Sequence, residues 1–165
     1  MADITPIYLD NAATTPVDPA VYAEMQPYFE NFTANPSSIH SHGRQAKVAV
    51  EKARKTIATL LHASPSEIFF TSGGTEADNT VLQSAVLHGG CKVIITSPIE
   101  HHAVLHTAEA WAKLGLAELK LVRVNTYGSI DLAHVEELLA SSEQAIVSLM
   151  HGNNEIGNLL DLNAV

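Results

Sequence analysis

The stretch FTSGGTEADN, residues 70–79, decides the fold because one predicted element ends in it and the next begins. The apolar run just before it, together with its first residues, predicts a short buried strand over residues 68–72. Residues 75–88 then have the composition of a helix, which Gly89 and Gly90 end. A strand that passes directly into a helix is typical of an α/β fold.

Two glycines, Gly73 and Gly74, stand just where this helix must begin. They allow close approach of the backbone, so a phosphate can meet the N–H groups of the first turn and the hydroxyls of Ser72 and Thr75. A simple helix cap, with Glu76 in the first turn, explains the same residues without a ligand. The stretch lacks the spacing of nucleotide-triphosphate and dinucleotide loops, so a smaller phosphate ester is the better candidate.

Strands and helices alternate through the rest of the chain. The expected strands cover residues 92–97, 119–125 and 145–150, and the expected helices cover 43–61, 101–114 and 131–140, the last with Asp131 as N-cap. Alternating elements with short connections predict a three-layer α/β/α domain with a mostly parallel sheet. Ligands bind at the carboxyl ends of such strands, so the candidate site comprises loops 71–75, 97–102 and 151–157.

Composition excludes several classes of protein. The 165 residues carry a formal net charge of −9 and are 46% hydrophobic, which is typical of a globular domain and argues against a nucleic-acid or anionic-membrane surface. No apolar run is long enough to span a membrane, and the N-terminus has no signal-peptide pattern. Cys91 is the only cysteine and is expected to be structural, without a disulfide in the chain. We therefore expect a cytoplasmic protein.

The loop after the strand at 92–97 contains Glu100, His101 and His102. His101 is a candidate stacking partner and acid/base group for a ligand, although capping of the following helix explains it as well. His102 and His106 lie four residues apart on one helical face, as metal ligands can. They lack a placed third ligand, since Glu109 would have to rotate toward them, and no metal is predicted.

Loop 151–157, HGNNEIG, follows the last expected strand. Its amides combine donor and acceptor in one group and can orient a ligand oxygen. An Asx-turn, which two asparagines beside a glycine form without any ligand, explains the same residues. The pattern does not choose between these two explanations.

Five motifs occur along the chain in one order. They are YLDNAATTPVDP at residues 8–19, ANPSSIHSHGRQA at 34–46, IFFTSGGTEADN at 68–79, SPIEHHAVL at 97–105 and MHGNNEIG at 150–157. Together they resemble the N-terminal half of a cysteine desulfurase, in the class V aminotransferase group of pyridoxal-phosphate enzymes with fold type I. Five separated motifs in register make this resemblance more specific than any one of them.

The resemblance implies roles for particular positions. Gly74 and Thr75 would hold the phosphate of pyridoxal 5'-phosphate, so the anion inferred above would be the cofactor's. His101 would stack on the pyridine ring and help to move protons, and Asn154 would hydrogen-bond the ring's hydroxyl side or the substrate. The loop near the substrate entrance would comprise Asn35, Pro36, Ser37 and Ser38.

The resemblance also implies a reaction. Sulfur taken from L-cysteine would leave L-alanine and pass as a protein-bound persulfide to a sulfur-acceptor protein, for iron–sulfur cluster or thio-cofactor assembly. The chemistry needs a lysine in Ser-x-His-Lys to anchor the cofactor, an aspartate for the pyridine nitrogen and a cysteine nucleophile. None has a match in the 165 residues, and none of the six lysines follows Ser-x-His. The chain alone is therefore expected to be inactive.

Two other functions stay open. One is a non-catalytic remnant or partner subunit that binds phosphate or pyridoxal phosphate through the same loops, and the other is a selenocysteine lyase or another class V aminotransferase. The stretches NNEIG and NPSSIH favour the desulfurase by resemblance. In that family, residues 1–15 would be associated with a small domain and residues 16–165 would form an incomplete aspartate-aminotransferase-like large domain of a homodimer.

Overall fold

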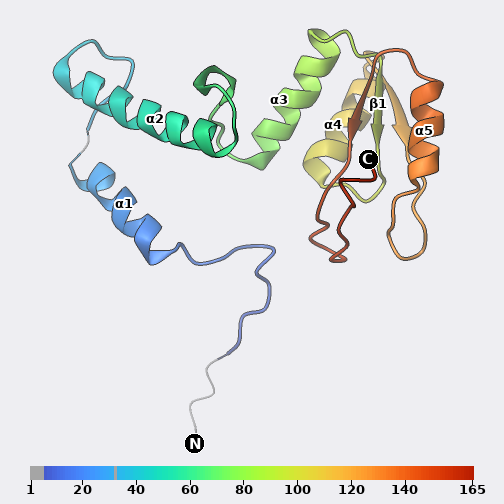
Figure 1. Ribbon diagram of the computed structural model, residues 1–165, viewed down its shortest axis with the longest axis horizontal. Helices are drawn as coiled ribbons and strands as arrows, with labels where there is room; N and C mark the ends of the chain where they lie inside the picture. Colours follow the sequence, from blue (N-terminus) through green and yellow to red (C-terminus); the bar gives the residue numbers. More distant parts are fainter. Residues whose placement is uncertain (1–5, 32) are drawn as a thin grey trace, which may run out of the picture. The chain divides into compact units, whose positions relative to one another are not determined.

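The computed structural model describes residues 6–31 and 33–165 (Figure 1). They form two compact units, divided between Phe70 and Thr71, which we describe separately. The expected segment 1–15 includes residues 1–5, which lie outside the described residues, and its association with a small domain stays a prediction.

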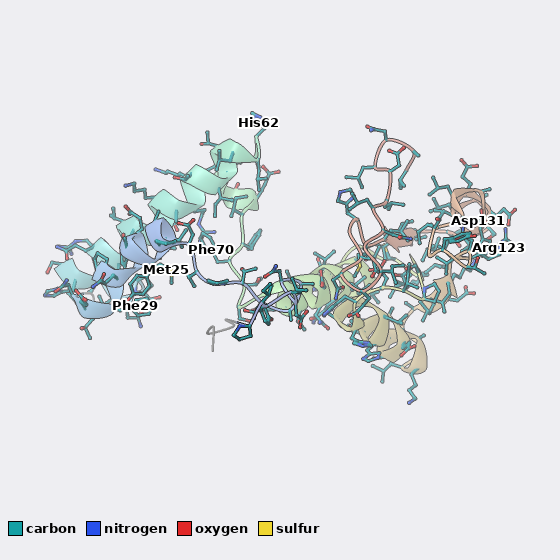
Figure 2. All side chains as sticks on the ribbon, turned by 90° about the horizontal axis from the view of Figure 1, so that it is seen from below. Met25, Phe29, His62, Phe70, Arg123 and Asp131 are labelled. Atoms are coloured by element: carbon teal, nitrogen blue, oxygen red, sulfur yellow. The ribbon has the colours of Figure 1, made fainter. Side chains whose placement is uncertain are left out.

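The first unit begins with helix α1, Pro19–Glu30, which the sequence analysis did not predict. Asp18 caps it, accepting a hydrogen bond from Ala20 N at 2.7 Å, and proline suits the first helical position. Apolar residues lie all round α1, and Met25 and Phe29, the latter 77% exposed, project from it (Figure 2). The helix therefore lacks the one-sided apolar stripe by which helices are found in sequences.

Helix α2, Ser41–Leu60, confirms the amphipathic helix expected over 43–61. The next turn is a short 3-10 helix, η1, Pro65–Glu67. It begins with a capping box in which Glu67 accepts a hydrogen bond from Ser64 N at 2.7 Å. Helix α2 and η1 directly precede the glycine-containing stretch at 70–79 in the chain.

The predicted strand over 68–72 is wrong, because these residues form no strand. Instead the Arg54 guanidinium donates a hydrogen bond to Ile68 O, and Arg54 Cζ lies 4.9 Å from the centre of the Phe70 ring. Phe69 is 81% exposed. An apolar run becomes a strand only where a neighbouring strand pairs with its backbone, and none of the described strands does so here.

The second unit alternates helices and strands as predicted. Its elements are α3 Gly74–Leu87, β1 Val93–Thr96, α4 His102–Lys113, β2 Glu118–Leu121, α5 Leu132–Ala140 and β3 Ala145–Ser148. The three strands form a parallel sheet in the order β2-β1-β3, with Val93 paired to Glu118 on one side and to Ala145 on the other. The central strand β1 is buried along its whole length.

Alternate residues of β1 face two separate cores. Ile94 packs with residues of α3 and α4, among them Leu82 and Val104. Val93 and Ile95 pack on the other face with Val122, which follows β2, and Val135 of α5. Figure 1 shows α4 and α5 on opposite sides of β1. This three-layer α/β/α arrangement confirms the predicted fold class.

Asp131 lies at the end of the connection from β2 to α5 and contacts residues on both sides of it. Asp131 accepts a hydrogen bond from His134 N at 3.1 Å, which confirms it as the N-cap of α5. Its other oxygen accepts from Arg123 Nε at 3.0 Å, and the two side chains lie together in Figure 2. The backbone bond from His134 and then the bond from Arg123 lower the pKa of Asp131.

None of the described helices is both long and apolar enough to cross a membrane.

Candidate functional site

The start of α3 presents unpaired backbone donors. Ala77 N is bonded to Gly73 O at 3.1 Å, but the N–H groups of Gly74, Thr75 and Glu76 precede the first carbonyl that an α-helix can offer them. A Cβ added at Gly73 or Gly74 would meet no atom within 4 Å. The space in front of these donors is therefore open, as an anion site requires.

The N-cap of α3 is Gly73, which makes no side-chain cap bond, while Glu76 in the first turn reaches back to Ser72. Glu76 Oε2 accepts from Ser72 N at 2.6 Å and from Ser72 Oγ at 2.7 Å. These bonds, the backbone one first, lower the pKa of Glu76. The Ser72 hydroxyl is thus already engaged, whereas the Thr75 hydroxyl has no hydrogen-bond partner among the described residues. Of the two predicted hydroxyls, Thr75 is the one available to a phosphate.

His101 is the N-cap of α4, in the loop after β1. Its Nδ1 accepts from Ala103 N at 3.1 Å, so the proton of the neutral ring is assigned to Nε2. The side chain is exposed. Capping, the alternative explanation for His101, is therefore observed, and it leaves Nε2 free to donate to a ligand.

The two adjacent asparagines after β3 have different surroundings. Asn153 is half-buried and makes the expected Asx-turn, with Oδ1 accepting from Glu155 N at 2.8 Å and from Ile156 N at 3.1 Å. Asn154 is exposed, and its Nδ2 donates to Glu155 Oε1 at 3.0 Å. The turn thus uses Asn153, so the amide of Asn154 can turn toward a ligand.

Two residues that the sequence analysis did not assign join the loops after β1 and β3. Glu100 Oε1 accepts from Met150 N at 2.6 Å, and Asn153 Nδ2 donates to Ile99 O at 2.9 Å. Burial raises the pKa of Glu100. The signal available in the sequence was position alone, since each residue directly precedes a predicted site residue, His101 or Asn154.

A cavity of about 260 Å³ lies between these two loops. Its lining includes His101 and Asn154, so two of the predicted cofactor-binding residues meet there. Gly74 and Thr75 do not line it. However, α3 and β1 run in opposite directions, which places the start of α3 at the end of the sheet where β1 stops (Figure 1). The charge of Asp78, one turn into α3, also helps to raise the pKa of Glu100.

Among the described residues, the two histidines of α4 contact each other and have no third ligand beside them. The rings of His102 and His106 are stacked, with centres 4.6 Å apart. No group of three or more histidine, cysteine or acidic side chains in the described part of the chain is arranged to hold a metal ion.

The predicted substrate-proximal residues belong to the first unit. Asn35 Oδ1 accepts from Ser37 N at 2.8 Å, and Asn35 O accepts from Ser38 N at 3.0 Å. The resulting turn packs against α2 so closely that a side chain at Gly43 would collide with Ser38. Asn35, Ser37 and Ser38 thus form one ordered turn, and its place near a substrate entrance stays a prediction.

Known proteins are similar to this chain in sequence. Residues 7–165 match the family model for aminotransferase class V. The cysteine desulfurase IscS of Dictyoglomus turgidum is 42% identical over 155 residues, covering 93% of this chain and 39% of that protein. The mitochondrial cysteine desulfurase of Drosophila melanogaster is 44% identical over 155 residues, covering 92% and 33%.

Solved structures are similar to this chain in fold. A NifS-like protein superposes with a TM-score of 0.85 at 40% identity, over 94% of this chain and 43% of that one. SspA, solved in complex with cysteine, superposes with a TM-score of 0.82 at 34% identity, over 92% and 44%.

The sheet, its helical layers and these structural neighbours define the α/β fold of fold type I pyridoxal-phosphate enzymes. The chain belongs to the aminotransferase class V family. The resemblance to cysteine desulfurases drawn from the five motifs is thereby confirmed. The chain spans 33% to 40% of the length of the curated relatives named cysteine desulfurase that it matches.

Proposed function

We propose that this chain forms the phosphate-binding part of the site in a pyridoxal-phosphate-dependent cysteine desulfurase. Its family depends on that cofactor, and the relatives described above carry the desulfurase name. The observation that carries the proposal is the start of α3, where unpaired N–H groups, open glycines and the unbonded Thr75 hydroxyl occur together. This donor set suits the dianionic phosphate of the cofactor.

In this proposal, the residues of α3 bind the phosphate by hydrogen bonds from Gly74 N, Thr75 N and Thr75 Oγ1. The dipole of α3 adds to these bonds, because its positive end faces the same space. Glu76 keeps its carboxylate turned back to Ser72, at 2.6 Å and 2.7 Å, and this contact holds the loop in shape. The α3 start thus orients the cofactor by its phosphate.

The residues of the neighbouring cavity would act on the ring and the substrate. His101 would stack on the ring and hold or release a proton at Nε2, since Nδ1 is engaged in the cap. Asn154 would donate from Nδ2 to the ring's hydroxyl side or to the substrate. When bound, pyridoxal phosphate supplies an electron sink for the substrate.

The substrate would be L-cysteine, which gives up its sulfur and leaves as L-alanine. The sulfur would pass as a persulfide to an acceptor protein for iron–sulfur cluster or thio-cofactor assembly, in a cytoplasmic homodimer. The lysine, aspartate and cysteine nucleophile that complete this chemistry have no match in these 165 residues. We therefore propose that the 165 residues alone do not turn over cysteine.

Titration with pyridoxal phosphate, followed by visible absorbance, tests the phosphate site. Thr75→Ala removes one charge-assisted donor and should weaken binding about tenfold. Thr80→Ala is the matched control, because it removes an exposed hydroxyl from the same helix, one that donates to Glu76 O at 2.7 Å. Equal affinities for the two variants would contradict the proposed site.

A further inference from the structure

We propose that Glu100 is a positioning residue, whose carboxyl group holds the loop after β1 to the loop after β3 and so sets His101 and Asn154 at one cavity. Its importance for cofactor binding rests on the function proposed above. The tie between the loops does not, and it can be tested without a cofactor.

The geometry places Glu100 at the junction of the two loops. Its Oε1 accepts from Met150 N at 2.6 Å and from Ser97 Oγ at 3.3 Å. Ser97 is fully buried at the end of β1, and Met150 follows β3. One carboxylate oxygen therefore accepts from residues just after both strands. Ser97 begins the loop that contains His101, and Met150 directly precedes the loop that contains Asn154.

The sheet itself cannot set these loops, because its hydrogen-bonded register stops before them. The ladder between β1 and β3 ends at the pair Thr96 and Ser148, where the Thr96 hydroxyl donates to Ser148 O at 2.8 Å. Beyond that pair, side chains must join the two segments. Glu100 is the first such tie, and the bond from Asn153 Nδ2 to Ile99 O is the second.

Burial, hydrogen bonds and neighbouring charges together set the direction in which the pKa of Glu100 moves. Burial is the largest influence and raises its pKa, against the lowering effect of the bonds from Met150 and Ser97. Asp78 of α3 raises the pKa and His101 lowers it. The other titratable groups that line the adjoining cavities are His102, Tyr127, Glu155 and Asp161.

Amide resonances of Met150 in the full chain give the first test. The Met150 N–H donates to the titrating carboxyl, so its chemical shift should follow pH, with a midpoint raised in the direction that burial of Glu100 dictates. In Glu100→Gln the shift should lose this titration while the bond persists, because the amide oxygen still accepts. Glu100→Ala should speed hydrogen exchange at Met150 about tenfold, since that bond is lost.

The control is Glu109→Ala, which removes an exposed carboxyl from α4 and should leave the Met150 resonance and its exchange unchanged. A Met150 shift that titrates equally in wild type and Glu100→Gln would overturn the inference. So would unchanged exchange in Glu100→Ala, because the loops would then be held without this side chain.

Pyridoxal-phosphate titration separates this inference from the proposed function. If both hold, Glu100→Ala binds the cofactor about tenfold more weakly than Glu109→Ala, and Glu100→Gln restores most of the affinity. If wild type binds no cofactor while the Met150 measurements agree with expectation, the proposed function fails and the tie stands. If wild type binds and Glu100→Ala binds equally well, the positioning role fails and the proposed function stands.

Discussion

Replacement of Asn153 by alanine tests how the loop after β3 is built. The Asn153 side chain makes three hydrogen bonds, of which the one to Ile99 O, at 2.9 Å, is partly buried. The other two, from Glu155 N and Ile156 N, are exposed. Counting about 1 kcal/mol for the buried bond and about 0.5 kcal/mol for each exposed one, Asn153→Ala should lower the free energy of unfolding by about 2 kcal/mol.

The neighbouring residue provides the matched control. Asn154 is exposed and makes one bond, to Glu155, so Asn154→Ala should change the free energy of unfolding by less than about 0.5 kcal/mol. Under the proposed function, Asn154→Ala should instead weaken pyridoxal-phosphate binding. Each substitution thus affects chiefly one of the two properties.

Urea unfolding followed by tryptophan fluorescence measures the difference. Trp111 is the only tryptophan and packs against the core of α3, α4 and β1, so its emission reports on the second unit. The reasoning is refuted if Asn153→Ala unfolds at the wild-type midpoint, or if Asn154→Ala is as unstable as Asn153→Ala.

Three further substitutions test the core, the first turn of α3 and the sheet. Leu82→Ala removes a side chain that is 1% exposed and should cost about 2–5 kcal/mol of unfolding free energy in urea, whereas Leu87→Ala, at a 48% exposed position of the same helix, should cost under about 1 kcal/mol. The pKa of Glu76 is lowered on folding, so its contribution to stability is full above pH 4.5, its ordinary pKa, and is lost as pH falls through the folded value. Unfolding midpoints from pH 7 to pH 3 should therefore fall less steeply in Glu76→Gln, and equal slopes would contradict this. Thr96→Val removes a fully buried donor, 2.8 Å from Ser148 O, and should cost about 1–2 kcal/mol by the same urea measurement, while an unchanged midpoint would show that this bond contributes nothing.

Much of the fold was predictable because it depends on local chemistry. Asp131 caps α5 as its position in the sequence indicated. The apolar run 93–96 became the buried central strand. The run at 68–70 is equally apolar but forms no strand, because strand formation needs a partner, which a local pattern cannot show. Helix α1 was missed since its apolar residues do not keep to one side.

Site residues were predictable where they belong to a local sequence motif, and not where their part depends on a partner far away in the sequence. His101 and Asn154 were found by their motifs, and both line one cavity, although their roles stay predictions. Glu100 and Asn153 were missed because their partners lie 50 and 54 residues away in the sequence. Burial of the Glu100 carboxyl depends on those same partners, so no local pattern reveals it.

Those long separations also have a consequence during synthesis. His101 can cap α4 as soon as that helix forms, since its partner is two residues away. The bond from Met150 to Glu100 must wait for 50 more residues, which take roughly 3–10 s at typical rates of translation. A ribosome-bound chain that stops before residue 150 would therefore have the histidine in place and no cavity beside it. Under the proposed function, the phosphate donors of α3 form early, and we expect the contacts of His101 and Asn154 with the cofactor to form together only when β3 and the loop after it emerge.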